Sequence, residues 1–386
     1  MLDILILWSV FAFFSFGFLA LNYVYTCKEA KKPWKIKTDE DYKPKVSLIV
    51  PTYNESEIIE YKLRNLAKLE YPQNLLQTVF IDSNSTDSTV AQIREFKEEN
   101  PDMDIRLLVE EERKGKSSAL NEALKSCNGE VIVISDADCF WPPDILLKSL
   151  QYLADPRVGA ISGPKKLLNP NSSWVTRSED SYLKSMNLMK LGESKIDSTI
   201  FFEGGFSAYK RDLLERFDPY QTGSDDCGTV IKFLEKNCRT LMLAEAEFFT
   251  TFPVTWNGKL EIKMRRANQL VQVLGKYGAL LFKNKILTGK QTVVKSLLSY
   301  LLAPVMFLFF VATTIYLMIE LPLTVALLLV FIIPRARSYF VEGAFNYLIL
   351  LYSIFSIISK RKFHTWVQPQ DRALFTENLL VQRGLI

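Results

Sequence analysis

Asp136 and Asp138 stand two residues apart at the end of the segment EVIVISDAD. In extended backbone, side chains with this spacing point to the same side, so both carboxylates can face one ligand. Carboxylate oxygens suit Mg²⁺ or Mn²⁺, which leave coordination positions for phosphate oxygens. The pair therefore predicts a metal site for a phosphate-bearing substrate. The alternative is that acids after a strand merely cap a helix or a turn.

A basic segment, KGKSSALN, lies just upstream of this pair. Lys114 and Lys116 flank Gly115, and a helix-like sequence follows. The start of a helix attracts anions, so a phosphate group can sit there. The GxxxxGK[ST] spacing of a Walker motif is missing, and an ordinary basic loop remains the alternative.

Other residue types exclude several kinds of chemistry. The chain has one histidine, His364, and five scattered cysteines without a CxxC pair. Catalysis by serine or cysteine with histidine, a zinc site and a disulfide framework are therefore not expected, and a reducing compartment fits. The formal net charge of +4 is modest and gives no reason to predict nucleic-acid binding.

The elements that must position these residues alternate between strand and helix patterns. The runs VSLIV and QTVFID predict buried strands, while residues 55–69 and a later segment with Val90, Ile93 and Phe96 have helical spacing. Such alternation predicts an α/β fold with a mostly parallel sheet, whose ligands bind at the carboxyl ends of the strands. Acids follow these strands at Asp82, Asp87, Asp136 and Asp138.

Long apolar runs at both ends predict membrane helices. Residues 2–26 are long enough to cross a bilayer, and a lysine-rich stretch, residues 28–37, follows them on the expected cytoplasmic side. A cleaved signal peptide is the less favoured alternative. Residues 295–318 predict a second span, and runs 323–333 and 339–358 bring the total to three or four. Residues 256–281 are amphipathic, and predict either a helix on the membrane surface or an ordinary packed helix.

Taken together, the motifs resemble the family 2 inverting glycosyltransferases, in the membrane-integrated branch that includes cellulose, chitin and hyaluronan synthases. The similarity extends from about Val46 to Leu274. Its pieces, in order, are VPTYNE, IDSNSTDST, GKSSALN, SDAD, FFEGGFSAYKRDLL, GSDDCGTVIKFLEK and KMRRANQLVQVL. Each piece is loose alone, and their order makes the match specific.

The resemblance implies a GT-A (Rossmann-like) fold and a role for each motif. It implies that Asp226, of the pair Asp225 and Asp226, is the general base, and that Asp138 and Asp136 hold the metal. Phe202 to Gly205 match the loop that shapes the acceptor side. A glycine-rich turn between strands is an equally good interpretation of this segment. The residues implied to bind the nucleotide donor are Pro51, Thr52, Tyr53, Glu55, Asp82, Lys116, Asp136 and Arg265.

Two departures from the family pattern narrow the prediction. Where the family has DDGS, this chain has Asp82 followed by Ser83, so one carboxylate of that pair is missing. Processive synthases carry QxxRW near the acceptor, whereas residues 262–266 here are IKMRR, which keeps Arg265 but not the glutamine or tryptophan. A guanidinium there can still bind a diphosphate. The missing tryptophan argues against a long polymer threading past the site.

The sequence thus predicts a metal-dependent hexosyltransferase of the cell membrane, with a cytoplasmic catalytic domain. Its donor is a GDP- or UDP-sugar, and its acceptor is lipid-linked, for instance through polyprenyl phosphate or diphosphate. The alternatives are a processive polysaccharide synthase, a membrane nucleotidyltransferase and a non-catalytic scaffold. The expected parts are a membrane helix at 1–27, a GT-A domain at 45–255, interfacial helices at 256–290, a membrane region at 293–360 and a cytoplasmic tail at 361–386.

Overall fold

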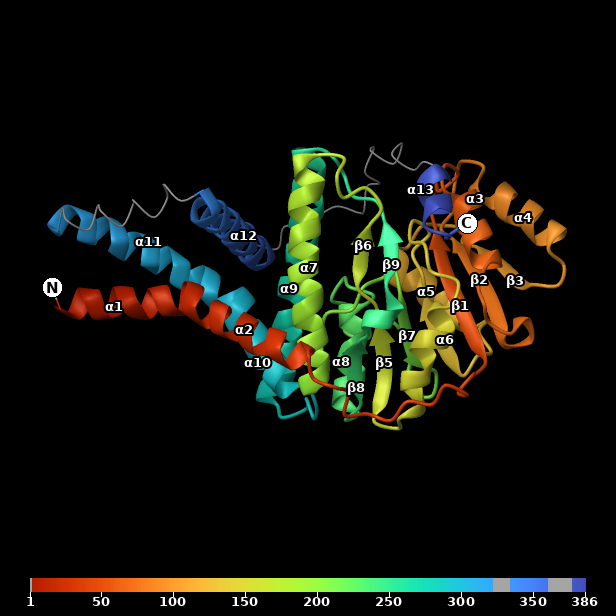
Figure 1. Ribbon diagram of the computed structural model, residues 1–386, viewed down its shortest axis with the longest axis horizontal. Helices are drawn as coiled ribbons and strands as arrows, with labels where there is room; N and C mark the ends of the chain where they lie inside the picture. The colour runs from red at the N-terminus through yellow and green to blue at the C-terminus, as the bar shows by residue number, and fades with distance from the viewer. Residues whose placement is uncertain (1, 322–333, 360–376) are drawn as a thin grey trace.

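The computed structural model describes residues 2–321, 334–359 and 377–386, and is built around a seven-stranded sheet of order β3-β2-β1-β4-β7-β5-β8 (Figure 1). β7 is antiparallel to its neighbours β4 and β5, and all other adjacent pairs are parallel. The predicted mostly parallel α/β sheet is confirmed. The strands are β1 (Val46–Thr52), β2 (Leu76–Asp82), β3 (Asp104–Val109), β4 (Val131–Ile134), β5 (Val158–Ser162), β7 (Ser207–Lys210) and β8 (Arg239–Met242).

Both faces of the sheet are covered, which explains why its central strands read as continuous apolar runs. In β1, Leu48 and Val50 point into one core and Ile49 into the other. The first core is closed by α3 (Ile59–Ala67), α4 (Thr89–Glu99) and α6 (Ile145–Leu150). The second is closed by α5 (Lys116–Leu124), α8 (Cys227–Glu235) and part of α9 (Trp256–Phe282).

A small parallel sheet lies beside the main one and connects distant parts of the chain. It pairs β6 (Lys165–Leu167) with β9 (Phe248–Thr250). Phe249 of β9 also exchanges backbone hydrogen bonds with Phe140, in the loop after β4. The short helix α13 (Glu377–Gln382) lies near α3 at this side of the molecule (Figure 1).

Three helices of the described residues are long and apolar enough to cross a membrane. The first, Leu2–Ala30, comprises α1 (Leu2–Ala12), a π-helical turn and α2 (Phe18–Ala30). The second, Lys290–Glu320, comprises α10 (Lys290–Leu297), a π-helical turn and α11 (Ala303–Glu320). The third, Phe340–Ile358, belongs to α12 (Pro334–Ile358). These match the predicted runs 2–26, 295–318 and 339–358, whereas the run 323–333 and His364 lie outside the described residues.

Two long helices stand between these apolar helices and the sheet, and run crosswise to them (Figure 1). One is α7 (Trp174–Ile196), which the sequence patterns do not predict; it packs against α2. The other is α9, which packs against α12. Leu274 and Tyr277 of α9 belong to the second core, while Ala267 and Val271 join a cluster with the apolar helices. Helix α9 is therefore a packed helix that connects the two parts.

Candidate active site

The carboxyl ends of β1, β2 and β4 meet at one edge of the sheet because these strands are parallel neighbours. Thr52, the last residue of β1, is in register with Asp82, the last residue of β2. Ser135 donates its backbone N–H to Ile49, so the segment carrying Asp136 and Asp138 leaves β4 at the same edge. The structure thus brings the predicted acids that follow β2 and β4 to the same edge as the end of β1.

Asp82 is fully buried at this edge and is held by a set of hydrogen bonds. Its Oδ2 accepts from the hydroxyls of Thr52 at 3.0 Å and Ser85 at 2.5 Å, and its Oδ1 accepts from the N–H of Ser85 at 2.8 Å. This network fixes the loop after β2 against the end of β1. The buried carboxylate of Asp82 therefore joins the ends of the two strands.

The neighbouring residues predicted to bind the nucleotide surround the same loop. Tyr53 lies with its ring 3.8 Å from the guanidinium carbon of Arg113. Glu55 is buried, and its N–H donates to Thr89 at the start of α4. Pro51 belongs to β1 itself. The guanidinium of Arg113 thus stacks on the ring of Tyr53, and a nucleobase could stack against the same pair.

Lys116 joins two acids that are far apart in the sequence. Its ammonium lies 2.7 Å from Asp136 Oδ1 and 2.8 Å from Asp225 Oδ2. It opens α5 directly after Gly115, whose φ of +97° only glycine adopts without strain. Desolvation lowers the pKa of Lys116, but the two carboxylates outweigh it and hold that pKa well above its usual value. The lysine is thus a fixed positive charge.

The two acids respond differently to this shared lysine. Desolvation opposes ionisation of Asp136, yet the charge of Lys116 keeps its pKa below the usual value. The pKa of Asp225 is raised, first by desolvation and then by its neighbours Asp226 and Asp136. A group that brings positive charge near these acids, such as a metal ion, would therefore find Asp136 already ionised.

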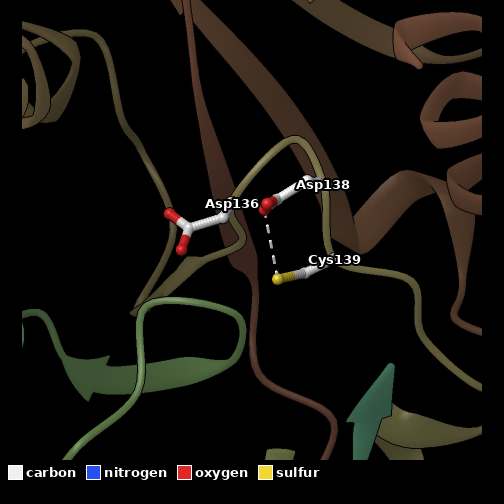
Figure 2. A group of neighbouring side chains, drawn as sticks. All are labelled: Asp136, Asp138 and Cys139. Carbon is white, nitrogen blue, oxygen red and sulfur yellow. Dashed lines mark hydrogen bonds between the residues drawn. The ribbon is translucent and has the colours of Figure 1, made fainter. Parts of the chain in front are cut away.

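Asp136, Asp138 and Cys139 form the one cluster of potential metal ligands in the part of the chain that the structure describes, with ligand atoms within 4.8 Å of one another (Figure 2). Cys139 Sγ lies 3.5 Å from Asp138 Oδ1. Burial, with the two aspartates, keeps the pKa of Cys139 well above its usual value, so the sulfur is a thiol rather than a thiolate. The oxygens of the two aspartates are the remaining donors, and they suit Mg²⁺ or Mn²⁺.

The segment FFEGGF leads into β7 and lies directly against these charges. Asp136 donates its N–H to Gly204 O at 3.1 Å. A Cβ at Gly204 would lie 2.8 Å from both Asp136 Oδ2 and Lys116 Nζ, so any larger residue here would displace these two charged groups. Glu203 pairs with Lys190 at 2.5 Å and with Lys165 at 3.5 Å. The segment is a tight turn, as its glycine-rich sequence suggests. It also supports the candidate metal ligand Asp136 through the hydrogen bond to Gly204.

The structure separates the roles open to Asp225 and Asp226. Asp225 faces Lys116, as described above. Asp226 is the N-cap of α8, and its Oδ1 accepts from Cys227 N at 2.6 Å and from Ser224 Oγ at 2.5 Å. The two acids thus lie at one turn with different partners, Lys116 for Asp225 and the start of α8 for Asp226. Burial and the neighbouring Arg266 lower the pKa of Arg265 of α9, and the charges of the acids Asp136, Asp225 and Asp138 oppose this only in part.

Two buried residues of α3 that the sequence patterns did not single out lie behind the candidate metal ligands. Lys62 is fully buried, and its ammonium donates to Ser135 Oγ at 2.5 Å and Cys139 O at 2.6 Å. Asn65 is buried and pairs with the backbone of Trp141. A signal existed in the sequence, since Lys62 lies three residues after Ile59 and four before Leu66, on the apolar face of its helix.

Comparison with known proteins identifies the family of the chain. Residues 44–268 match the family described as glycosyltransferase like family 2. A β-monoglucosyldiacylglycerol synthase from Synechocystis is 30% identical over 155 residues, which are 39% of this chain and 32% of the relative. A poly-β-1,6-N-acetyl-D-glucosamine synthase from Staphylococcus epidermidis is 26% identical over 181 residues, 47% of this chain and 43% of the relative. The chain thus matches less than half the length of these relatives.

A solved structure resembles nearly the whole chain. It is a mannosyltransferase from Pyrobaculum calidifontis in complex with GDP-Man and Mn²⁺. It has a TM-score of 0.77 and 29% sequence identity, and the match covers 93% of this chain and all of that one. The predicted GT-A fold is confirmed by this likeness together with the sheet described above.

Proposed function

Since the chain belongs to the family 2 glycosyltransferases, which use nucleotide sugars, we propose that it transfers one hexose, with inversion, to a lipid-linked acceptor at the cytoplasmic membrane face. The observation that carries the proposal is the charge cluster of Lys116, Asp136, Asp138 and Asp225 at the carboxyl edge of the sheet. It combines a fixed cation with two ionisable oxygen ligands, as a diphosphate leaving group requires.

In this proposal each group at the edge has one task. Asp136 and Asp138 hold Mg²⁺ or Mn²⁺, which when bound neutralises the diphosphate. Lys116 keeps Asp136 ionised and in place. The acceptor hydroxyl attacks the anomeric carbon from the face opposite the diphosphate, and the electron pair of the broken bond leaves on the diphosphate oxygen. Asp226 takes the hydroxyl proton, with Asp225 as the alternative base.

The place of the site relative to the apolar helices supports a lipid acceptor. Helix α9 carries Arg265 beside the acids, and its other face packs against the apolar helices. The site therefore lies one helix away from the candidate spans. The proposed parts follow from this arrangement: a membrane helix, a GT-A domain, the connecting helix α9 and a C-terminal membrane region. The lysines after Ala30 support a cytoplasmic orientation.

GDP-mannose is the first donor to test, because the mannosyltransferase that resembles nearly the whole chain was solved with it. Thermal-shift titration of the purified chain with GDP, UDP and their sugars, each with Mn²⁺ or Mg²⁺, identifies the donor class. Radiolabelled sugar from that donor should then enter lipid extract. Asp138→Asn and Asp226→Asn should each reduce transfer by about 100-fold or more, while the exposed control Asp102→Asn should not.

The alternative of a processive synthase has support in the relative that makes poly-β-1,6-N-acetyl-D-glucosamine. Product mass separates the two functions. One added hexose per acceptor supports the proposal, and a ladder of many additions contradicts it. Full transfer by both Asp138→Asn and Asp226→Asn would show that the active site has been assigned wrongly.

A further inference from the structure

The two candidate metal ligands lie on a loop, residues 135–141, that leaves the main sheet after Ser135 bonds to Ile49. Asp136 binds Gly204 through its N–H, and Phe140 exchanges two 2.8 Å backbone hydrogen bonds with Phe249 of the small sheet. Lys116 and Gly204 hold Asp136 from the front, so contacts behind the loop supply the remaining support for Asp136 and Asp138.

Helix α3 holds the loop at both of its ends. Lys62 donates to Ser135 Oγ and to Cys139 O, which lie just before and just after the two aspartates. Asn65, nearly one helical turn later, accepts from Trp141 N at 2.9 Å and donates to Trp141 O at 2.8 Å. These contacts make α3 the back wall of the metal cluster.

Residues 377–386 cover this back wall from the outside. Asn65 gives its second amide hydrogen to Leu385 O at 2.6 Å. Phe140, which is fully buried, packs with Leu380, Leu385 and Ile386. Gly384, at a φ of +66°, turns the chain so that Leu385 N bonds back to Leu380 O.

Two further contacts attach the same segment to both partners of the loop. Glu377 forms a 2.6 Å ion pair with Arg64 of α3. The guanidinium of Arg383 lies 4.9 Å from the ring of Phe249, the residue that pairs with Phe140. The segment is thus bound to α3, to the loop and to β9 at once.

We propose that residues 377–386 are positioning residues for the metal-binding loop, and that packing of Leu380 and Leu385 on Phe140 keeps Asp136 and Asp138 at the spacing a divalent cation needs. The proposal rests on the metal use proposed above. Groups that orient metal ligands commonly change metal affinity by 10- to 100-fold when they are removed. Since this segment follows the last apolar helix in the sequence, the chain returns from the candidate spans to its own active site.

The test compares two adjacent residues of α13 in the full chain. Leu380 is fully buried, and Val381 is 52% exposed. In Leu380→Ala we expect the Mn²⁺ dissociation constant, measured by calorimetry well below the melting temperature, to rise about 10-fold. Amide exchange of the peptide containing residues 135–141 should also accelerate, while β1 stays protected. Val381→Ala should have the Mn²⁺ dissociation constant and amide exchange of the wild type. Leu380→Met, which keeps the side-chain volume, should have them as well.

An unchanged Mn²⁺ dissociation constant in folded Leu380→Ala overturns the proposal, because a purely structural role would change only the melting temperature. If Leu380→Ala does not fold, Ile386→Ala replaces it with the same expected results. If the wild type binds neither Mn²⁺ nor a nucleotide diphosphate, the proposed function fails. Amide exchange of residues 135–141 then decides whether the segment holds the loop, and unchanged exchange refutes that as well.

Discussion

Lys116 is the residue on which the electrostatics of the site depend, because it neutralises Asp136 and Asp225 together. We predict that Lys116→Met lowers kcat/KM by about 100-fold or more, since one preorganised charge at a reacting phosphate is commonly worth that much. Radiolabel transfer measures it. Lys125→Met, at the other end of α5 and exposed, is the control and should stay within about 2-fold. Equal activities in the two variants would contradict the role.

Glu193 of α7 is a buried acid outside the candidate active site. Burial raises its pKa to about 7, and this outweighs the opposing effects of the Thr199 hydroxyl, which donates to it at 2.7 Å, and of Lys190 and Lys295. The folded state therefore binds a proton that the unfolded state releases above pH 4.5, its ordinary pKa. Stability from this proton is complete below pH 4.5 and is lost as the pH rises to about 7.

This shift predicts that Glu193→Gln stabilises the protein at high pH. The cost of ionising Glu193 in the folded state is about 3 kcal/mol, and an amide does not carry it. The melting temperature of the variant should exceed that of the wild type at pH 8 and equal it at about pH 4.5. Thermal unfolding at both values measures the difference, and a parallel shift at both would exclude titration as the cause.

At the scale of elements, the turn before β7 approaches the charge cluster closely at Gly204. Gly204→Ala would place a methyl group 2.8 Å from Asp136 Oδ2 and Lys116 Nζ. We predict that it weakens Mn²⁺ and donor binding by about 10-fold, since it displaces a ligand and its partner. Calorimetric titration measures both affinities. Wild-type affinity for both would mean that the turn can retreat from the cluster.

Gly275 of α9 provides a matched glycine where space is open. It is exposed within the helix, and no atom lies within 4 Å of an added Cβ. Gly275→Ala should therefore stabilise the protein by about 0.5–1 kcal/mol, because alanine loses less backbone freedom in a helix than glycine. A higher melting temperature with unchanged transfer is expected. A lower one would indicate that α9 needs flexibility at this point.

At the scale of the whole molecule, one buried lysine ties the candidate spans to the catalytic domain. Lys259 of α9 lies 2.9 Å from Ser178 and 4.0 Å from Glu179, both of α7, and 3.6 Å from Glu342 of α12. Lys259 and Glu179 are each 2% exposed. Removing one charge leaves the other buried with less compensation, which is more costly than removing both.

Lys259→Met should accordingly destabilise the protein by about 3 kcal/mol, and adding Glu179→Gln should recover most of the loss. Thermal unfolding in detergent completes this double-mutant cycle. Lys283→Met, at an exposed position of the connection after α9, is the control and should change little. Additive effects of the two substitutions would show that Lys259 and Glu179 do not interact.

Features that depend on neighbours in the sequence could be predicted from it. The apolar runs of β1, β2 and β4 and the acids after them follow from the period of the strands and the polarity of their ends. The three long apolar helices follow from length and composition. The order of the motifs gave the family, and the family gave the GT-A fold.

The tertiary structure alone decided how distant residues combine. The antiparallel direction of β7, the helix α7 and the attachment of residues 377–386 to α3 are set by packing between segments far apart in the sequence. The pairing of Lys116 with Asp225, and the presence of Lys62 behind the candidate metal ligands, arise in the same way. Local periodicity predicts which face of a helix or strand is buried. It does not predict which element covers that face or which charges pair across the contact, because these depend on segments far apart in the sequence.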